Sequence, residues 1–401
     1  MSKLVIIGAG HAGGSVAGFL KQYGYEGQII LAGSERVPPY QRPPLSKAWL
    51  KGEADAQSLQ LRADDFYTEN GIDLRLGVTA TAIDRAAKTV TFDDGRSESY
   101  DYLVIATGSH ARRLPVPGGE DEGLLELRTT VDAERLKAVL GEGKRLVVVG
   151  GGYVGLEAAA SARALGAEAV VLERMDRVLQ RVASETLSRF YTDLHQQHGV
   201  KIRTGVEVTS VSANSVTLSD GEVIEADGVL VGIGALATDG LALAAGLDCA
   251  DGIIVDAEAR TSDPAIFAVG DVTRRPLAHY GIQHRLESVP NALEQAKQVA
   301  SAITGRAQPT PEVPWFWSDQ YDAKLQIAGL AVGASGQVVR GEPQSGSFAV
   351  FHLNGAEVVC VEAVNAAQSF MFGKQAIAKG LSIDAAVLAD EAAPIKSATK
   401  S

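Results

Sequence analysis

Cysteine is scarce in this sequence, with only Cys249 and Cys360 among 401 residues. Because the two stand far apart, the sequence excludes a disulfide framework, a cysteine-rich zinc site and a CxxC redox pair. We therefore predict no metal site. No apolar run reaches the length of about 18 residues that a membrane-spanning helix needs. The N-terminus carries no signal-peptide pattern, so we expect a cytoplasmic protein without a membrane partner.

Positive charge is also in deficit. The chain has 37 Lys and Arg against 49 Asp and Glu, a formal net charge of -12. An acidic chain of this kind argues against a nucleic-acid partner and favours a soluble protein that binds anions only at local basic patches. A length of 401 residues is typical of two or three domains.

Two glycine-rich motifs are the strongest signals present. Residues 8–13 read GAGHAG and residues 150–155 read GGGYVG, and each motif lies between an apolar β-branched run and an alanine-rich segment. Between a strand and a helix, such glycines permit a tight turn and let a pyrophosphate approach the helix N-terminus. We assign Gly8, Gly10, His11, Ala12 and Gly13 to one dinucleotide, and Gly150, Gly152, Tyr153, Val154 and Gly155 to a second.

Each motif is followed by an acid at the end of the next apolar run, Glu35 in the first case and Glu173 in the second. Both acids lie near the spacing of about 20 residues at which a carboxylate accepts a hydrogen bond from a ribose hydroxyl. Two complete βαβ units therefore predict two bound dinucleotides.

The motifs also head an internal repeat. Residues 71–78, 88–95 and 100–108 correspond to residues 199–206, 214–221 and 226–234. Alternating β-branched residues broken at Asp-Gly pairs predict a small antiparallel meander in each half. Each half is thus a βαβ unit, a meander and a return strand that ends in glycine.

The first half is longer between its acid and its meander. The extra residues include the proline-rich, basic segment 38–47, PPYQRPPLSK, which has no counterpart in the second half. A rigid, basic segment suggests a clamp on a permanently bound cofactor, although a solvated proline-rich loop fits the composition as well.

Several motifs together resemble a known family. The chain is similar to the FAD-dependent NADH:ferredoxin reductases of bacterial oxygenase systems, which include putidaredoxin reductase and the reductases of aromatic-ring dioxygenases. The resemblance covers essentially the whole chain. It rests on the first glycine motif with Glu35, RPPLSK at 42–47, ATG at 106–108, the second glycine motif continuing to Glu157, AVGDV at 268–272, RLESV at 285–289 and WFWSDQ at 315–320.

The resemblance implies an α/β fold with two Rossmann-like, three-layer nucleotide-binding domains of the glutathione-reductase type and a C-terminal α+β domain. The implied FAD domain is discontinuous, at 1–110 and 240–310. The NAD domain covers 111–239, and the C-terminal domain covers 311–401. In the last domain we expect strands at 325–328, 336–340, 347–353 and 357–361 and a helix at 366–379.

The resemblance also implies roles for single residues. FAD is expected to be resident on the first glycine motif, with Glu35 on the adenosine ribose and Arg42 on the pyrophosphate. Lys47 resembles the family's lysine beside the flavin, and Glu157 resembles its carboxylate partner. The remaining residues expected to contact FAD are Pro44, Ala106, Thr107, Gly108, Arg128, Asp271, Val289 and Trp317. Taken alone, Lys47 would be a solvated lysine and Glu157 a surface acid at a helix start.

NADH is expected at the second glycine motif, with Gly234 nearby. A carboxylate at Glu173 accepts from a 2′-hydroxyl and repels a 2′-phosphate, so NADH is favoured over NADPH. Arg174 and Arg177 follow at once and leave room for NADPH. Tyr153 is expected to stack over the flavin, with ordinary packing as the alternative. Relatives carry a Pro-Asn turn after the glycine that corresponds to Gly234, and this chain does not.

The absence of cysteine from residues 42–49 separates this chain from disulfide reductases and from NADH oxidases or peroxidases of the same architecture. The resemblance implies that single electrons leave the flavin for a two-iron two-sulfur ferredoxin that feeds a haem monooxygenase or a ring-hydroxylating dioxygenase. Lys47, Glu157 and Trp317 are the expected catalytic residues. Trp317 resembles the tryptophan between flavin and partner, and Arg306, Lys374 and Lys379 are candidates for the docking patch.

Two other functions stay open. One is a reductase of the same fold whose acceptor is rubredoxin, a quinone or oxygen. The other is a redox signalling flavoprotein similar to the apoptosis-inducing factors, although the basic surface that such a role requires is missing from this acidic chain.

Overall fold

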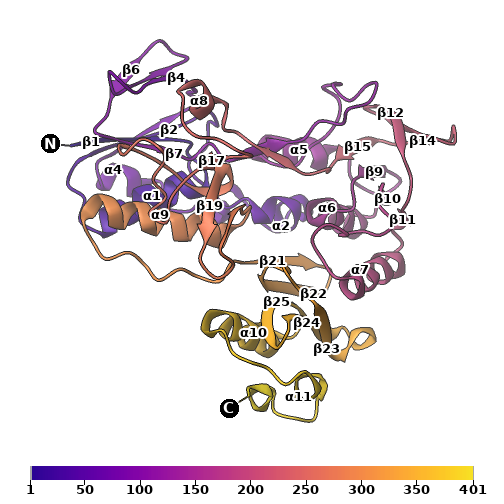
Figure 1. Ribbon diagram of the computed structural model, residues 1–401. Coiled ribbons are helices and arrows are strands. Elements are labelled where there is room, and N and C mark those ends of the chain that lie inside the picture. The colour runs from indigo at the N-terminus through magenta and orange to yellow at the C-terminus, as the bar shows by residue number, and fades with distance from the viewer. Residues whose placement is uncertain (1, 401) are drawn as a thin grey trace. The chain divides into compact units, whose positions relative to one another are not determined.

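The structure, a computed structural model, describes residues 2–400. It divides into two compact units, and Figure 1 labels their helices and strands. Unit 1 consists of Met1–Arg42, Ala56–His110 and Leu236–Pro314, and unit 2 consists of Pro43–Asp55, Ala111–Ala235 and Trp315–Ser401. Within the described residues, no helix is both long and apolar enough to cross a membrane.

Unit 1 is built on a five-stranded parallel sheet in the order β18-β7-β1-β2-β3. The strands are β1 (Lys3–Ile7), β2 (Gln28–Gly33), β3 (Ile72–Leu76), β7 (Tyr102–Ile105) and β18 (Ile266–Ala268). Helices α1 (His11–Gln22) and α9 (Val289–Thr304) lie side by side on one face. The smaller elements of the unit are α3 (Ala56–Leu59), α4 (Asp65–Glu69), α8 (Gly240–Ala244), β17 (Ile253–Ile254), the 3-10 turn η2 (Gly270–Val272), β19 (Thr273–Leu277) and β20 (Ile282–Arg285).

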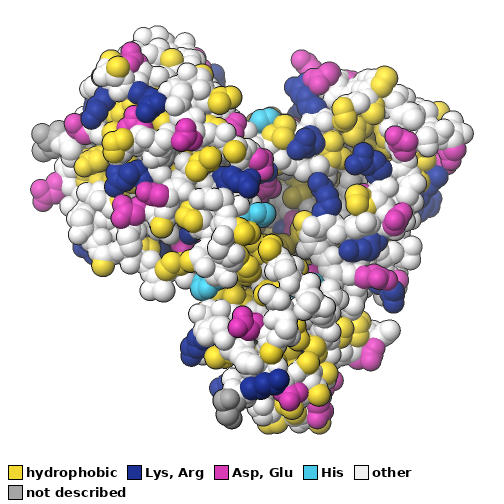
Figure 2. Space-filling view, viewed as in Figure 1, with side chains coloured by type: hydrophobic (Ala, Val, Ile, Leu, Met, Phe, Trp, Pro, Cys, Tyr) yellow, Lys and Arg dark blue, Asp and Glu magenta, His cyan; other side chains and the backbone are white. Residues whose placement is uncertain are grey.

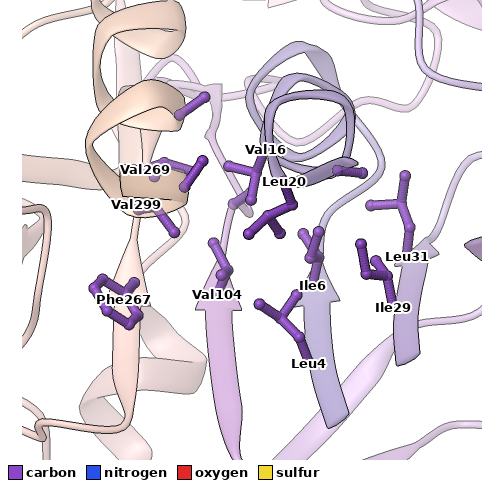
Figure 3. Close-up of a cluster of buried hydrophobic side chains, with 14 of the residues drawn as sticks. Leu4, Ile6, Val16, Leu20, Ile29, Leu31, Val104, Phe267, Val269 and Val299 are labelled. Carbon is purple, nitrogen blue, oxygen red and sulfur yellow. The ribbon is translucent and has the colours of Figure 1, made fainter. Parts of the chain in front are cut away.

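Strands β1, β2, β7 and β18 are largely buried on both faces, as is typical of a parallel sheet, and the edge strand β3 is partly exposed. Successive residues of β1 point to opposite faces. Leu4 and Ile6 pack with Val16 and Leu20 of α1 and with Val299 of α9 (Figure 3). The intervening residues of β1 pack in a second cluster on the other face, with the meander β4 (Ala80–Asp84), β5 (Thr89–Phe92) and β6 (Ser97–Ser99).

Unit 2 repeats this pattern with a four-stranded parallel sheet in the order β11-β10-β9-β15. Its strands are β9 (Arg145–Val149), β10 (Glu168–Leu172), β11 (Lys201–Arg203) and β15 (Gly228–Val231). The helices are α5 (Thr130–Ala138), α6 (Tyr153–Ala164) and α7 (Glu185–Gln197). The second meander is β12 (Val208–Ser212), β13 (Ser215–Leu218) and β14 (Val223–Glu225). Both predicted meanders are confirmed, and their Asp-Gly pairs form the turns between β5 and β6 and between β13 and β14.

The C-terminal part of unit 2 is a five-stranded antiparallel sheet in the order β21-β22-β25-β24-β23. Its strands are β21 (Trp315–Gln320), β22 (Ala323–Gly329), β23 (Gly336–Glu342), β24 (Ser347–Asn354) and β25 (Glu357–Val364). They are followed by α10 (Ala367–Lys379), α11 (Ala385–Ala389) and the 3-10 turn η4 (Ile395–Ala398), and the 3-10 turn η3 (Pro343–Ser345) joins β23 to β24. The predicted strands and helix of this region are confirmed, whereas the strand Trp315–Gln320 and the short elements η3, α11 and η4 were not predicted.

Parallel sheets covered by helices, followed by an antiparallel sheet with a helix, confirm the predicted α/β class. The predicted division into three domains stays a prediction. In the two units described here, the antiparallel sheet groups with residues 111–235. The segment Pro43–Asp55, which contains η1 (Pro43–Ser46) and α2 (Ala48–Lys51), also groups with unit 2. The short strands β8 (Ser109–Ala111) and β16 (Ala235–Ala237) stand where the chain passes between units.

Candidate active site

The first glycine motif forms the predicted turn between β1 and α1. Gly8 has a φ of +107°, and a Cβ there would lie 2.2 Å from the Ala106 carbonyl oxygen. A Cβ on Gly13 would lie 2.0 Å from the Gly8 oxygen. Gly10 caps α1 without a side-chain hydrogen bond, and the first turn of α1 carries no acid. The free N–H groups of this helix end, together with the helix dipole, suit a pyrophosphate.

Arg42 lies beside this helix end, since a Cβ built on Gly10 would lie 3.7 Å from Arg42 Nη2. The same nitrogen donates to Glu35 Oε1 at 2.6 Å, and the Tyr40 hydroxyl donates to Glu35 Oε2 at 2.7 Å. Glu35 and Arg42 are therefore held together within unit 1. A guanidinium next to an open helix N-terminus provides a second group for an anionic ligand.

His11 opens α1 and has a buried Nδ1 with no hydrogen-bond partner among the described residues. The pKa of its ring is lowered to about 4, mainly by burial; the Asp271 carboxylate opposes this shift and Arg42 adds to it. A buried ring nitrogen without a partner fits a site that a polar ligand completes. Ala12 lies next in the same turn, close to Gly270.

The other FAD residues predicted in unit 1 gather at the carboxyl ends of β7 and β18. Thr107 Oγ1 donates to the Thr238 carbonyl oxygen at 2.7 Å, and Gly108 has a φ of +68°. Asp271 stands in η2 after β18 and accepts from Ser109 Oγ at 3.2 Å. Val289 begins α9, whose N-cap is Ser288. Ligands of open α/β sheets bind at this edge, so these residues fit a nucleotide there.

The second glycine motif, in unit 2, has the same geometry. Gly150 has a φ of +113°, and a Cβ there would lie 2.4 Å from the Gly232 oxygen. A Cβ on Gly155 would lie 2.4 Å from the Gly150 oxygen. Gly152 caps α6 without a side-chain hydrogen bond, and Val154 is 46% exposed. This helix end is also open to a pyrophosphate.

Glu173 follows β10, and backbone amides hold both of its carboxylate oxygens. Gly151 N donates to Oε2 at 2.7 Å and Met175 N donates to Oε1 at 2.8 Å. Of the two arginines that were expected to moderate its charge, Arg177 instead donates to the carbonyl oxygens of Ala183 and Gln180 and to Ser188 Oγ. Its guanidinium is therefore engaged within the unit, and Arg174 is exposed.

Gly234 follows Gly232 and Ile233, whose backbone atoms lie against Gly150, and Arg128 stands before α5. Gly234 has a φ of +106°, and its carbonyl oxygen accepts from Arg112 N at 2.9 Å. Arg128 directly precedes the capping box in which Thr129 and Asp132 close the start of α5, and its N–H donates to Asp132 Oδ2 at 3.2 Å. Their assignment to a bound nucleotide stays a prediction.

Lys47 and Glu157 form a buried ion pair in unit 2. Lys47 Nζ lies 2.6 Å from Glu157 Oε2, and the two side chains are 19% and 7% exposed. Ser46 Oγ donates to the same oxygen at 2.5 Å, and Ser318 Oγ donates to Glu157 Oε1 at 2.5 Å. Pro44 lies one turn earlier, in η1, and its carbonyl oxygen accepts from Lys47 N. The alternatives of a solvated lysine and a surface acid are therefore excluded.

Tyr153 and Trp317 occupy different surroundings. The Tyr153 ring packs edge-on against Phe316, with centroids 4.9 Å apart. Its buried hydroxyl has no hydrogen-bond partner among the described residues, and burial raises its pKa well above the usual value. Trp317 is partly exposed on β21, and its ring centroid lies 5.7 Å from that of Trp315. Its role toward a partner stays a prediction.

The three candidate docking residues belong to different units. Arg306, in unit 1, lies over the Tyr23 ring at 4.8 Å. Lys374, in unit 2, lies over the Trp315 ring at 5.1 Å, and Lys379 is exposed at the end of α10. On the face seen in Figure 2, basic and acidic side chains are mixed. Their membership of one docking patch stays a prediction.

No sequence pattern predicted a role for the serines that bind Glu157. Ser46 and Ser318 both stand inside motifs that carried the resemblance, RPPLSK and WFWSDQ. Ser318 could have been recognised only if β21 had been predicted as a strand. Alternation along a strand then indicates that Ser318 faces the same way as Phe316.

Comparisons with known proteins agree with this architecture. The family model "Pyridine nucleotide-disulphide oxidoreductase" matches residues 2–296, and the model "Reductase C-terminal" matches residues 315–399. The chain is 50% identical over 381 residues to the "Probable ferredoxin reductase CtmF" of Castellaniella defragrans, which covers 94% of this chain and 93% of that protein.

Two solved structures are similar over nearly the whole length. One, titled as the covalent putidaredoxin reductase-putidaredoxin complex, has a TM-score of 0.96 and 42% identity and covers 98% of this chain and 97% of that chain. The other, the ferredoxin reductase of the CYP199A2 system from Rhodopseudomonas palustris, has a TM-score of 0.95 and 40% identity and covers all of both chains. With two open glycine turns and a C-terminal antiparallel sheet, the chain belongs to the FAD-dependent ferredoxin reductases of bacterial oxygenase systems.

Proposed function

We propose that this protein oxidises NADH and passes the two electrons, one at a time, to a two-iron two-sulfur ferredoxin that serves an oxygenase. The observation that carries the proposal is the buried Lys47–Glu157 pair. The segment 42–49 is the one that holds redox cysteines in the disulfide reductases of this architecture, and here it holds Lys47 and no cysteine. Without a thiol acceptor in this segment, the electrons leave for a partner outside the chain.

We assign the nucleotides on the geometry of the two helix ends. FAD takes the first, because Arg42, which is bonded to Glu35, stands beside Gly10. At the second motif, the described groups nearest to a Cβ on Gly151 belong to Val178 and Glu173. When bound, FAD converts a two-electron hydride donor into a source of single electrons. Thr107, Gly108, Asp271 and Val289 complete the predicted FAD edge of unit 1, and Pro44, Arg128 and Trp317 are the predicted contacts from unit 2.

Coenzyme choice follows from Glu173. Two backbone amides fix its carboxylate, so it cannot turn away from an incoming ribose. A fixed carboxylate accepts from a 2′-hydroxyl and repels a 2′-phosphate. Since Arg177 is engaged by its own loop, the protein uses NADH in preference to NADPH.

The Lys47 ammonium supplies a fixed positive charge, and Glu157 holds it in place. A charge that is already oriented needs no rearrangement during the reaction. We place this charge at the flavin, where it favours the reduced, more negative ring. The balanced reaction takes one NADH and two oxidised ferredoxins and gives NAD⁺, one proton and two reduced ferredoxins.

The test is to mix the FAD-loaded protein with NADH and compare acceptors. Fast reduction of a two-iron two-sulfur ferredoxin, with slow consumption of oxygen, supports the proposal. Faster turnover with rubredoxin, a quinone or oxygen than with any ferredoxin would replace it by the first alternative. A reduced complex that persists for minutes with every acceptor would favour the signalling alternative. The cytoplasmic location stays a prediction.

A further inference from the structure

The hydrogen bonds around Glu157 extend much further than the ion pair. They continue through three side chains of unit 2 that are at most 1% exposed, namely Ser318, Gln320 and His195. Gln320 Nε2 donates to Ser318 Oγ at 3.1 Å, and Gln320 Oε1 lies 2.7 Å from His195 Nε2. The Tyr321 hydroxyl lies 3.4 Å from His195 Nδ1 and ends the chain of contacts.

Local structure explains how these residues meet. Along β21, Phe316, Ser318 and Gln320 alternate with Trp315, Trp317 and Asp319, which line a shared hollow, and so lie on one face of the strand. Phe316 packs on Tyr153 of α6, and Ser318 bonds Glu157 one helical turn further on. Gln320 then reaches His195 of α7. One strand therefore links the two helices through side chains that carry no net charge.

The charge on Glu157 fixes the direction of every bond. An ionised carboxylate only accepts hydrogen bonds, so the Ser318 hydroxyl must donate its one proton to Glu157. Ser318 Oγ must then accept, which turns the amide nitrogen of Gln320 toward it and the amide oxygen toward His195. His195 must in turn donate from Nε2, which leaves Nδ1 as the acceptor for the Tyr321 hydroxyl.

His195 is suited to this position because burial lowers the pKa of its ring to about 4, so at neutral pH it has one donor and one acceptor nitrogen. Bonds that all point the same way polarise one another and strengthen the last one. If Gln320 turned over while His195 kept its proton on Nε2, two acceptors would face each other at Ser318 and two donors at His195, and buried groups left unsatisfied in this way destabilise the fold. With Glu157 Oε1 accepting from Ser318, every later member of the series has a partner.

We propose that Ser318, Gln320 and His195 are positioning residues that hold the Glu157 carboxylate aimed at Lys47, and that they thereby set the rate at which NADH reduces the flavin. The proposal rests on the function proposed for the Lys47–Glu157 pair. Residues of α7 and β21 then affect the first half of the reaction, the reduction of the flavin by NADH. Neither element carries any part of a glycine motif.

The test measures NADH reduction of the FAD-loaded protein by anaerobic stopped-flow absorbance, without ferredoxin, for Gln320→Met, Glu157→Gln and the double variant. We expect Gln320→Met to slow flavin reduction about 3- to 10-fold at an unchanged NADH half-saturation, and less than about 2-fold when Glu157 is already glutamine. Equal slowing in both backgrounds would show a merely structural role and overturn the proposal, as would no slowing.

A second pair of variants keeps the test decisive if Gln320→Met does not fold. His195→Gln retains a donor for Gln320 and is expected to keep the wild-type rate, whereas His195→Leu removes it and is expected to slow flavin reduction. Thr192→Val is the matched control on α7, because its hydroxyl donates only to the Ser188 carbonyl oxygen of the same helix. Identical rates for the two His195 variants would overturn the proposal.

Failure of this inference and failure of the proposed function give different results. If Glu157→Gln slows flavin reduction and the Gln320 and His195 variants do not, the ion pair keeps its proposed role. The positioning role proposed for Ser318, Gln320 and His195 is then wrong. If Glu157→Gln itself has no effect on flavin reduction, the role proposed for the Lys47–Glu157 pair is wrong. The positioning role of Ser318, Gln320 and His195 is then wrong as well.

Discussion

Lys47 Nζ and Glu157 Oε2 lie 2.6 Å apart, and the Glu157 side chain is only 7% exposed. A pair this deep is not a surface salt bridge of small value. Taking charges out of water is costly, and the cost is offset here by donors from Ser46 and Ser318 as well as from Lys47. An arrangement maintained at such cost is consistent with a role in the reaction.

Removal of the Lys47 ammonium group should reveal the desolvation cost of the buried Glu157 carboxylate. We expect Lys47→Met to lower the free energy of unfolding by about 2–4 kcal/mol, because Glu157 is left as a buried carboxylate without its counter-charge. The double variant Lys47→Met/Glu157→Gln should recover part of the loss. Urea denaturation followed by fluorescence measures both. A loss from Lys47→Met below about 0.5 kcal/mol would mean that the pair is effectively solvated.

The first glycine motif offers a prediction that separates folding from cofactor binding. Gly10→Ala places a Cβ no closer than 3.7 Å to any other group, so the fold should be kept while the new methyl group obstructs a pyrophosphate. Gly13→Ala places a Cβ 2.0 Å from the Gly8 oxygen and should disturb the turn itself. The FAD content per chain and the far-ultraviolet circular dichroism of each purified variant distinguish the two effects. A fully loaded Gly10→Ala protein would contradict the assignment of FAD to this helix end.

Coenzyme preference should depend on Glu173. We expect Glu173→Ala to reduce the ratio of kcat/KM for NADH over NADPH by about tenfold or more, since both the ribose acceptor and the repulsive charge are lost. Glu168→Ala is the matched control, because this acid stands at the other end of β10 and pairs with Arg145 and Lys201. An unchanged NADH/NADPH ratio for Glu173→Ala would mean that residues other than Glu173 determine the coenzyme preference.

Acid should destabilise the fold through His195. Its pKa is lowered to about 4 in the folded protein, against about 6.5 in an unfolded chain. Between these two pH values the unfolded state binds a proton that the folded state does not, so stability falls as the pH falls from about 6.5 toward 4. We expect His195→Gln to lessen this fall by up to about 1.4 kcal/mol per pH unit. Urea denaturation from pH 7 to pH 4 measures it, with the exposed His279→Gln as control.

Trp317 should act only in the second half of the reaction. We expect Trp317→Ala to slow ferredoxin reduction about tenfold or more, since large partly exposed aromatic residues dominate many interfaces. NADH reduction of the flavin should be unchanged. Trp315→Ala, on the same face of β21, tests whether the effect is specific. Equal effects of the two variants on both half-reactions would argue against a dedicated role for Trp317.

Much of this architecture could be predicted from the sequence because it depends on local rules. The glycine turns at Gly8 and Gly150 require positive φ, and the apolar β-branched runs before them can only be buried strands. The role of Lys47 came from resemblance alone, since nothing local distinguishes it from a solvated lysine. The grouping of Pro43–Asp55 with unit 2 depends on contacts to α6 far along the chain.

The residues that surround Glu157 could not be predicted for the same reason. Ser318 and His195 meet it or its partners only after β21 has packed against α6 and α7. The hydrogen bonds from Arg177 to carbonyl oxygens of its own loop could not be predicted either, because every residue has a backbone carbonyl group and the sequence does not show which one accepts.

The central claim is that hydride enters from NADH and single electrons leave to a protein partner. The most direct test is an anaerobic titration in which a limiting amount of NADH is added to catalytic FAD-loaded protein and excess oxidised two-iron two-sulfur ferredoxin, with ferredoxin reduction followed by absorbance. We expect two reduced ferredoxins per NADH consumed. NADH consumption without ferredoxin reduction, or a flavin that stays reduced while the ferredoxin stays oxidised, would contradict it.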